Sequence, residues 1–239
     1  MSRLKRPGTL TSEVVAYIKD AVIRGEFEPE QPLPEVRLAQ DLETARVTVR
    51  VALRALADVG LVEIIPHRGA FVTSLSPRKA WEIFSLRALL ESYAVRLALE
   101  NGPLTGDALD DLERLLGRIA ETAEEDDPTE LIETVMAFHL AIANLGRHEL
   151  LVGQLENLQT QTRRLIFYTK LYQSDPLSEV DSHQQVLDAL RSGDSAEAER
   201  AIFEHHLAAG DRLVQRMTEQ DGRGRGELPR RSPGRSPAE

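Results

Sequence analysis

Apolar positions recur at helical spacing near the start of the chain and then change to a short β pattern. Val14, Ile18 and Val22 lie four residues apart, which is typical of one face of a helix. The elements predicted from such spacing and from turn residues are helices at about 11–24, 35–42 and 46–59 and strands at about 61–65 and 70–73. Three helices followed by a β-hairpin is the order of a winged helix-turn-helix, with the hairpin as the wing.

Beyond residue 76 the pattern is helical throughout. Ser76-Pro77, Asp127-Pro128 and Asp175-Pro176 each place a capping oxygen before a proline, as helix N-termini often do. We therefore predict an all-α bundle of six or seven helices, drawn at about 77–100, 106–124, 129–145, 149–173, 177–191 and 195–218. In the first of these helices, the apolar stripe expected to face the core is Ile83, Leu86, Leu90, Tyr93 and Leu97.

These patterns predict a mainly α chain with four segments. They are a flexible N-terminus (1–10), the winged helix-turn-helix (11–75), the helical bundle (77–218) and a disordered tail (219–239). The tail is rich in Gly, Pro, Ser and Arg and nearly lacks apolar side chains, so it cannot bury enough surface to offset the entropy of ordering.

Charge is distributed unevenly along the chain, whose net charge is −10. Residues 1–76 carry ten basic and ten acidic side chains, whereas residues 77–220 carry 14 basic against 26 acidic ones. Since an acidic bundle repels phosphate, any contact with DNA belongs to the first domain. The absence of cysteine excludes disulfides and thiolate sites and suits a cytoplasmic protein. Neither a membrane-spanning run nor a secretory signal is expected.

The third predicted helix has the side chains of a DNA-reading helix. Arg46, Thr48 and Arg50 fall within a turn and a half, and Arg54 continues the face of Arg50. We expect these positions to face DNA, while the inward positions are Val47, Val51, Leu53 and Leu56. The alternative is a solvated helix whose arginines pair with Glu43 or Asp58.

The predicted hairpin strengthens the DNA-binding interpretation. Its tip has the sequence Pro66-His67-Arg68-Gly69, and an arginine on a wing can enter a minor groove.

Three histidines lie on mostly apolar faces of three separate predicted helices of the bundle. Imidazoles of His139, His183 and His205 that project into one core could converge on a divalent metal. The alternative is three hydrogen-bonded core histidines. Arg87 flanks the first apolar stripe and could hold a carboxylate, although a salt bridge to Glu91 explains it equally well.

Four runs of the first domain resemble the GntR winged-helix regulators. They are GEFEPEQPLPEVRLA (25–39), ARVTVRVALRAL (45–56), GLVE (60–63) and PHRGAFV (66–72). The resemblance implies that Arg46 and Arg50 contact DNA with help from Thr48, and that Gly69 lets the wing approach the groove. The chain departs from the family at Ala45, which replaces a capping serine that Thr44 could substitute for, and at Glu30, which replaces a glycine.

The bundle resembles the FCD ligand-binding domain. The similar runs are LRALLE (86–91), FH (138–139), SHQQVLDALRSGD (182–194) and AIFEH (201–205). In many members an aspartate and three histidines hold a metal that binds a small carboxylate. The resemblance therefore implies zinc, nickel or manganese on His139, His183 and His205, although Val135 occupies the aspartate position and His206 is an ambiguous neighbour of His205.

The leading functional hypothesis is a cytoplasmic, homodimeric transcriptional regulator, most simply a repressor. Its partners would be a near-palindromic double-stranded operator and a small carboxylate effector held by Arg87 and Arg164 beside the metal. One alternative is a dimeric DNA-binding protein whose pocket is unused. Another is a metal-dependent hydrolase, but no general base stands beside the histidines and residues 11–75 would have no role, so an enzyme is not expected.

Overall fold

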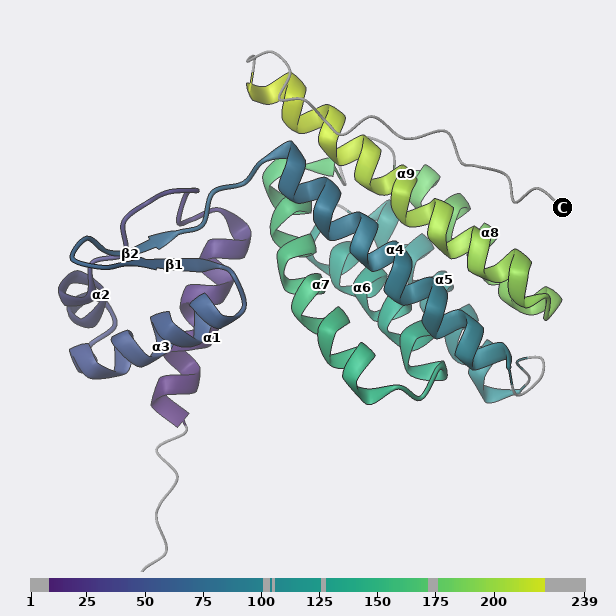
Figure 1. Ribbon diagram of the computed structural model, residues 1–239, viewed down its shortest axis with the longest axis horizontal. Helices are drawn as coiled ribbons and strands as arrows, with labels where there is room; N and C mark the ends of the chain where they lie inside the picture. The colour runs from purple at the N-terminus through teal and green to yellow at the C-terminus, as the bar shows by residue number, and fades with distance from the viewer. Residues whose placement is uncertain (1–8, 101–103, 105, 126–127, 172–175, 222–239) are drawn as a thin grey trace, which may run out of the picture.

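The computed structural model describes residues 9–100, 104, 106–125, 128–171 and 176–221, and it confirms the mainly helical fold class (Figure 1). A winged helix-turn-helix contains α1 (Thr9–Arg24), α2 (Glu35–Asp41), α3 (Arg46–Asp58), β1 (Val62–Ile65) and β2 (Gly69–Val72). A bundle of six helices follows, namely α4 (Pro77–Leu99), α5 (Asp107–Glu124), α6 (Pro128–Leu145), α7 (Glu149–Thr169), α8 (Pro176–Ser192) and α9 (Ser195–Asp221). Within these residues, no helix is long and apolar enough to cross a bilayer.

The winged domain has its own hydrophobic core. The predicted face of α1 packs against α3, and the fully buried side chains on α3 are Val49, Ala52, Leu53 and Leu56. The antiparallel wing pairs Val62 with Val72 and Ile65 with Gly69. Because Val62 and Val72 are buried in the same core, the hairpin is fixed at its base while its tip extends into solvent.

Helix ends follow local chemistry, and three of them, at the start of α1 and the ends of α7 and α9, differ from the predicted bounds by two or more residues. The Ser76 hydroxyl accepts a hydrogen bond from the Lys79 amide at 3.1 Å, as a capping residue should, whereas Asp127 and Asp175 lie outside the described residues. Helix α7 ends at Thr169 rather than near 173, because Lys170 has a left-handed φ of 52°.

The last helix continues to Asp221, so the predicted start of the tail at residue 219 is wrong. Leu213 and Met217 are buried in the bundle core, and this packing holds the final turns of α9 in place. Helix α1 begins at Thr9, so the flexible N-terminus predicted for residues 1–10 is wrong at its last two positions. The remaining residues of the two predicted segments, 1–8 and 222–239, lie outside the described residues.

The inward face of α4 differs from the predicted stripe. Leu86 and Tyr93 are 45% and 44% exposed, whereas Ile83 is buried together with Arg87 and Glu91. Helix α4 lies against α6, α7 and α9, and these neighbours meet the face that carries the Arg87–Glu91 ion pair. Hydrophobic periodicity misplaced the stripe because the buried face contains charged side chains.

The two domains meet along α7, the bundle helix that also packs against α1 (Figure 1). Arg164 of α7 donates hydrogen bonds to the hydroxyl and carbonyl oxygens of Thr73, just after β2, at 2.6 and 2.5 Å. Gln161 donates to the carbonyl of Val59, just after α3, at 3.3 Å. A single bundle helix therefore contacts the chain on both sides of the wing hairpin, just before β1 and just after β2.

Candidate functional sites

Helix α3 presents one basic face to solvent. Its side chains Arg46, Arg50 and Arg54 are exposed and Thr48 is partly exposed, as expected. Val47 and Val51 are 63% and 47% exposed, so the expectation that they pack inward is wrong. The core lies on the opposite face, where Val49 is fully buried. Exposed valines on such a helix can contact thymine methyl groups.

The arginines of α3 pair with an acid that the sequence did not single out. Arg50 donates two hydrogen bonds to the carboxylate of Glu35 on α2, at 2.8 and 2.7 Å, and Arg46 lies 3.7 Å from the same carboxylate. Hydrogen bonding by Arg50 lowers the pKa of Glu35. The partner is Glu35, rather than Glu43 or Asp58. The pair holds the Arg50 guanidinium in a defined position beside the start of α3.

Basic residues of α3 and of the wing line one surface groove. Arg50, Arg54, Arg68 and Gly69 are all among its lining residues. At the wing tip, Arg68 lies over the Phe71 ring with 5.5 Å from its guanidinium carbon to the ring centroid, and the exposed His67 has a φ of 62°. The structure therefore gathers predicted DNA contacts from two elements onto one surface.

The N-terminus of α3 has no side-chain cap. Ala45 is the N-cap residue, and the buried hydroxyl of Thr44 makes no hydrogen bond, so the expected substitution by Thr44 is wrong. The Thr44 amide donates to the Ala39 carbonyl at 2.9 Å, which fixes this residue in the turn between α2 and α3. The first amides of α3 consequently remain available to an external acceptor such as a phosphate oxygen.

Four histidines meet inside the bundle, one more than the predicted set. His139 on α6, His183 on α8 and His206 on α9 are fully buried, and His205 on α9 is partly buried. The ring of His139 lies 5.1 Å from that of His183 and 5.0 Å from that of His205 between centroids. The predicted histidines therefore converge, and His206 joins them.

Two of these imidazoles direct nitrogen atoms at each other. Nε2 of His139 lies 3.2 Å from Nε2 of His183. Nδ1 of His183 lies 2.5 Å from the carbonyl oxygen of Glu179, which can only accept, so the proton of this ring is on Nδ1. Burial lowers the pKa of both rings, that of His139 to about 3, so both are neutral. Such a pair of nitrogens is suited to share a cation.

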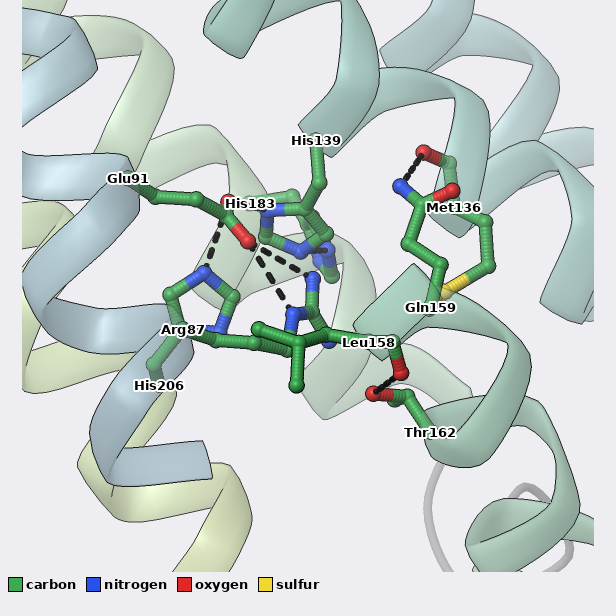
Figure 2. Close-up of polar contacts among 9 residues, drawn as sticks. All are labelled: Arg87, Glu91, Met136, His139, Leu158, Gln159, Thr162, His183 and His206. Atoms are coloured by element: carbon green, nitrogen blue, oxygen red, sulfur yellow. Dashed lines mark hydrogen bonds and ion pairs between the residues drawn. The ribbon is translucent and has the colours of Figure 1, made fainter. Parts of the chain in front are cut away.

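A buried carboxylate organises the other side of the cluster (Figure 2). Arg87 donates two hydrogen bonds to Oε1 of Glu91, at 3.1 and 2.9 Å. Oε2 of Glu91 lies 2.9 Å from Nδ1 of His139 and 2.7 Å from Nε2 of His206, so the carboxylate pairs with both rings. Burial would raise the pKa of Glu91, but His206, Arg87 and His139 hold it well below its usual range.

This donor set fits a divalent metal. His139, His205 and His206 each offer a nitrogen within 4.8 Å of the others, and burial keeps the imidazoles neutral, as metal ligation requires. Glu91 Oε2 pairs with Nδ1 of His139 and Nε2 of His206, and such a carboxylate beside metal-binding imidazoles fixes the orientation of their rings. Val135 lines the cavity at the position where the resemblance implied an aspartate.

The cavity around the histidines has a volume of about 50 Å³ and is also lined by Arg87. This space suffices for an ion and one or two small groups, because a water molecule occupies about 30 Å³ in the liquid. Arg164 is not among the lining residues, since its guanidinium faces Thr73 at the domain junction. The structure thus separates the two arginines that were expected to hold one effector.

The sequence analysis did not assign a role to His206 or Glu35, which the structure places in the histidine cluster and beside Arg50. Ile202, His206 and Leu213 are buried on the inward side of α9, and the spacing of four and seven residues would have favoured His206 over His205. For Glu35 the sequence contains no comparable signal, because the contact with Arg50 joins separate helices.

Comparison with known proteins gives consistent matches across the chain. The FCD domain model matches residues 82–209, and the model for bacterial regulatory proteins of the gntR family matches residues 10–72. The HTH-type transcriptional repressor GlaR of Escherichia coli is 30% identical over 206 residues, which span 83% of this chain and 94% of GlaR.

Two further relatives support the same assignment. A probable D-xylose utilization operon transcriptional repressor of Paenarthrobacter nicotinovorans is 29% identical over 203 residues, 84% of this chain and 87% of the relative. The solved structure of E. coli McbR/YncC superposes with a TM-score of 0.71 at 26% identity, covering 87% of this chain and 98% of McbR.

Proposed function

Because the chain belongs to the GntR family of bacterial regulatory proteins and carries an FCD domain, we propose that it is a repressor controlled by a small carboxylate effector. As a helix-turn-helix transcriptional regulator it is not an enzyme. Its relatives include GlaR, which is named a repressor, and a probable D-xylose utilization operon repressor. The observation that carries the proposal is a buried cluster of neutral imidazoles in the same chain as an exposed arginine groove. Such a regulator acts in the cytoplasm, where the operator is.

DNA reading is assigned to α3 and the wing. Arg46, Thr48, Arg50 and Arg54 would enter a major groove, while Thr44 and the wing residues His67, Arg68 and Gly69 would lie against the backbone and the neighbouring minor groove. In support, Arg50, Arg54 and Arg68 already line one groove.

A homodimer is proposed because operator reading by two half-sites requires two reading heads about 34–36 Å apart or a multiple of that spacing. The surface we assign to it is the exposed apolar face of α4, formed by Leu86, Leu89 and Tyr93. These side chains share one side of the helix, and a second copy would remove them from water. Two-fold symmetry of the protein then matches a near-palindromic operator.

The effector site is assigned to the histidine cavity. A divalent ion of zinc, nickel or manganese would be held by the predicted His139, His183 and His205 together with His206. In support, nitrogens of His139, His205 and His206 lie within 4.8 Å of one another, and Nε2 of His183 lies 3.2 Å from Nε2 of His139. When bound, the ion supplies positive charge and open coordination positions for carboxylate oxygens. Arg87 lines the same cavity and adds a guanidinium. The small volume favours an effector of only a few carbon atoms unless the helices separate.

Helix α7 connects this cavity to the reading head. Ile166 lines the cavity, and Arg164, only two residues earlier, is bonded to Thr73. An effector that moved α7 would therefore change how the winged domain is held. Thermodynamic linkage then requires that DNA and effector alter each other's affinity by the same factor.

The proposal is tested by fluorescence anisotropy with duplex fragments from the promoter region next to the protein's own gene. We expect salt-dependent, sequence-specific binding that a small organic acid alters, and His183→Ala should lose both metal content and the acid response. Specific binding without metal or any acid response would instead support a dimeric regulator whose pocket is unused. A protein that ignored all duplexes even at low salt would overturn the proposal.

A further inference from the structure

A second cavity lies at the junction of the two domains. It has a volume of about 410 Å³ and is lined by Gly60 and the segment 73–76 from the end of the winged domain, and by side chains of α4 and α7. A space of this size is within the range of small-molecule sites. No residue that lines it also lines the histidine cavity.

The main cation of the junction cavity has no counter-ion. Arg164 is 4% exposed, and its only partners within the described residues are the two oxygens of Thr73, both uncharged. These bonds use two of the five N–H donors of a guanidinium. Burial lowers the pKa of Arg164 to about 10, with no opposing carboxylate. A buried charge is normally paired, so this arrangement is costly unless an anion joins it.

Other side chains around the cavity add positive charge. Arg78 and Lys79 at the start of α4 line it, and Glu82 is its one acidic side chain among the described residues. Glu82 is already bound by Arg78, with 3.0 Å between Nε and Oε1. The lining therefore has a net charge of about +2 inside a segment, 77–220, with 14 basic and 26 acidic residues. A cluster of positive charge within an otherwise acidic segment indicates a site for an anion.

We propose that this junction cavity binds a small oxyanion, the phosphate or carboxylate group of a metabolite, with Arg164 as its principal contact and Lys79 as a second one. The planar guanidinium suits two oxygens of such a group. Gln161 and Ser74 also line the cavity and offer neutral hydrogen-bond donors.

The position of the site gives it a consequence for the whole chain. Gly60 follows α3, Thr73 follows β2, and Arg164 belongs to the bundle, so a bound anion contacts both domains. Its binding stabilises the arrangement of domains seen in the structure. This inference concerns a site separate from the histidine cavity, and it stands whether or not that cavity binds a carboxylate.

The test is a titration of the full chain with inorganic phosphate, and in a second arm with malonate, against chloride at equal ionic strength. We expect phosphate, malonate or both to raise Tm and to give a saturable heat of binding by calorimetry. Tighter binding of phosphate would identify the ligand's anionic group as a phosphate, and tighter binding of malonate would identify it as a carboxylate. Absence of any difference from chloride in both arms would overturn the proposal.

Variants locate the anion. Arg164→Gln and Lys79→Gln should each weaken binding by roughly tenfold or more, since each removes one charge from the contact. The control Arg163→Gln changes the neighbouring arginine, which pairs with Glu133 at 2.7 Å and does not line the cavity.

The site can still be tested if the Arg164→Gln variant does not fold. Lys79 is exposed, so Lys79→Gln is expected to fold and decides the matter alone if the other variant does not. Equal affinities in Lys79→Gln and Arg163→Gln would show that the anion binds elsewhere and would refute the site.

Discussion

The ion pair between Arg50 and Glu35 orients a side chain that we propose contacts DNA. The pair is partly exposed, so it contributes little to stability, but it limits the positions that the guanidinium can adopt. A side chain that is already oriented loses less entropy when it contacts a base.

Replacing Arg50 tests this role. Arg50→Ala should weaken operator binding by about 1–3 kcal/mol, because a bidentate contact to a base edge is worth that much. Anisotropy titrations at fixed salt measure the change. The matched control is Arg37→Ala, on α2, whose exposed side chain lies 3.6 Å from Asp41 and does not line the groove. Equal losses in the two variants would remove Arg50 from the base-reading set.

Glu30 occupies a backbone position suited to glycine. Its φ is 65°, which is unfavourable for a residue with a Cβ atom. Glu30→Gly should therefore raise the free energy of unfolding by about 0.5–1 kcal/mol, the relief of left-handed strain less the added entropy of the unfolded chain. Urea denaturation followed by circular dichroism gives the value. An unchanged or lower stability would show that the loop tolerates this conformation without cost.

At the residue scale, sequence reasoning succeeded where a local pattern or a family motif contains the signal. The resemblance marked Glu30 as a departure from a family glycine, and in the structure this residue has the positive φ that glycine adopts without strain. Convergence of His139 and His183 followed from apolar faces on separate helices. The Glu35–Arg50 contact and the position of Arg164 depend on tertiary structure, which no local pattern contains.

At the scale of elements, α4 and α9 are held together by a close approach. A Cβ atom added at Gly210 would lie 2.7 Å from Cβ of Phe84, a distance that real contacts do not reach. Phe84 also lines the histidine cavity, and its ring lies 6.5 Å from that of His206. The small residue therefore sets both the helix spacing and the shape of the cavity.

Substitution of this glycine should be costly. Gly210→Ala is expected to lower the free energy of unfolding by about 1–3 kcal/mol, because the core must shift to accept one methyl group. Gly153→Ala on α7 is the matched control, since nothing lies within 4 Å of the place that its new methyl group would take and helix propensity favours alanine by up to about 1 kcal/mol. Chemical denaturation of both variants compares them. A stabilised Gly210→Ala would contradict the close packing.

Sequence patterns predicted all the described elements but erred on which faces are buried. For α3 the apolar residues Val47 and Val51 were assigned to the core, although they lie on the exposed face. For α4 the buried face contains Arg87 and Glu91, which periodicity counts as polar. Both errors occur at surfaces or cavities assigned to function, where burial is no longer governed by hydrophobicity alone.

At the scale of the whole molecule, the exposed face of α4 predicts a dimer. Leu89→Glu places a charge in the centre of this face, where desolvating it on association is unfavourable. We expect the variant to be monomeric and to bind the operator more weakly, as shown by sedimentation and anisotropy. The control Leu150→Glu changes another exposed leucine, which lies at the start of α7. A dimer that persisted in Leu89→Glu would assign the interface to another face.

The four histidines of the cavity also make stability depend on pH in a definite direction. Burial lowers the pKa of His139 to about 3 and lowers those of His183, His205 and His206, so the folded chain stays unprotonated at pH values where an unfolded histidine takes up a proton. The free energy of unfolding is therefore not reduced by these histidines above about pH 6.5. It falls progressively as the pH decreases from there toward their lowered pKa values.

At pH values well below 6.5, His139 alone should lower the free energy of unfolding by about 1.4 kcal/mol for each pH unit, because its ring takes up one proton on unfolding. Denaturation of chelator-treated protein between pH 7.5 and 5 measures the slope without a metal competing for the nitrogens. His139→Gln should reduce the slope by about one proton, since glutamine does not titrate. If the wild-type free energy of unfolding were constant over this range, the imidazoles would have to be solvated in the folded chain, and the cavity would lose the neutral ligands that make it a metal site.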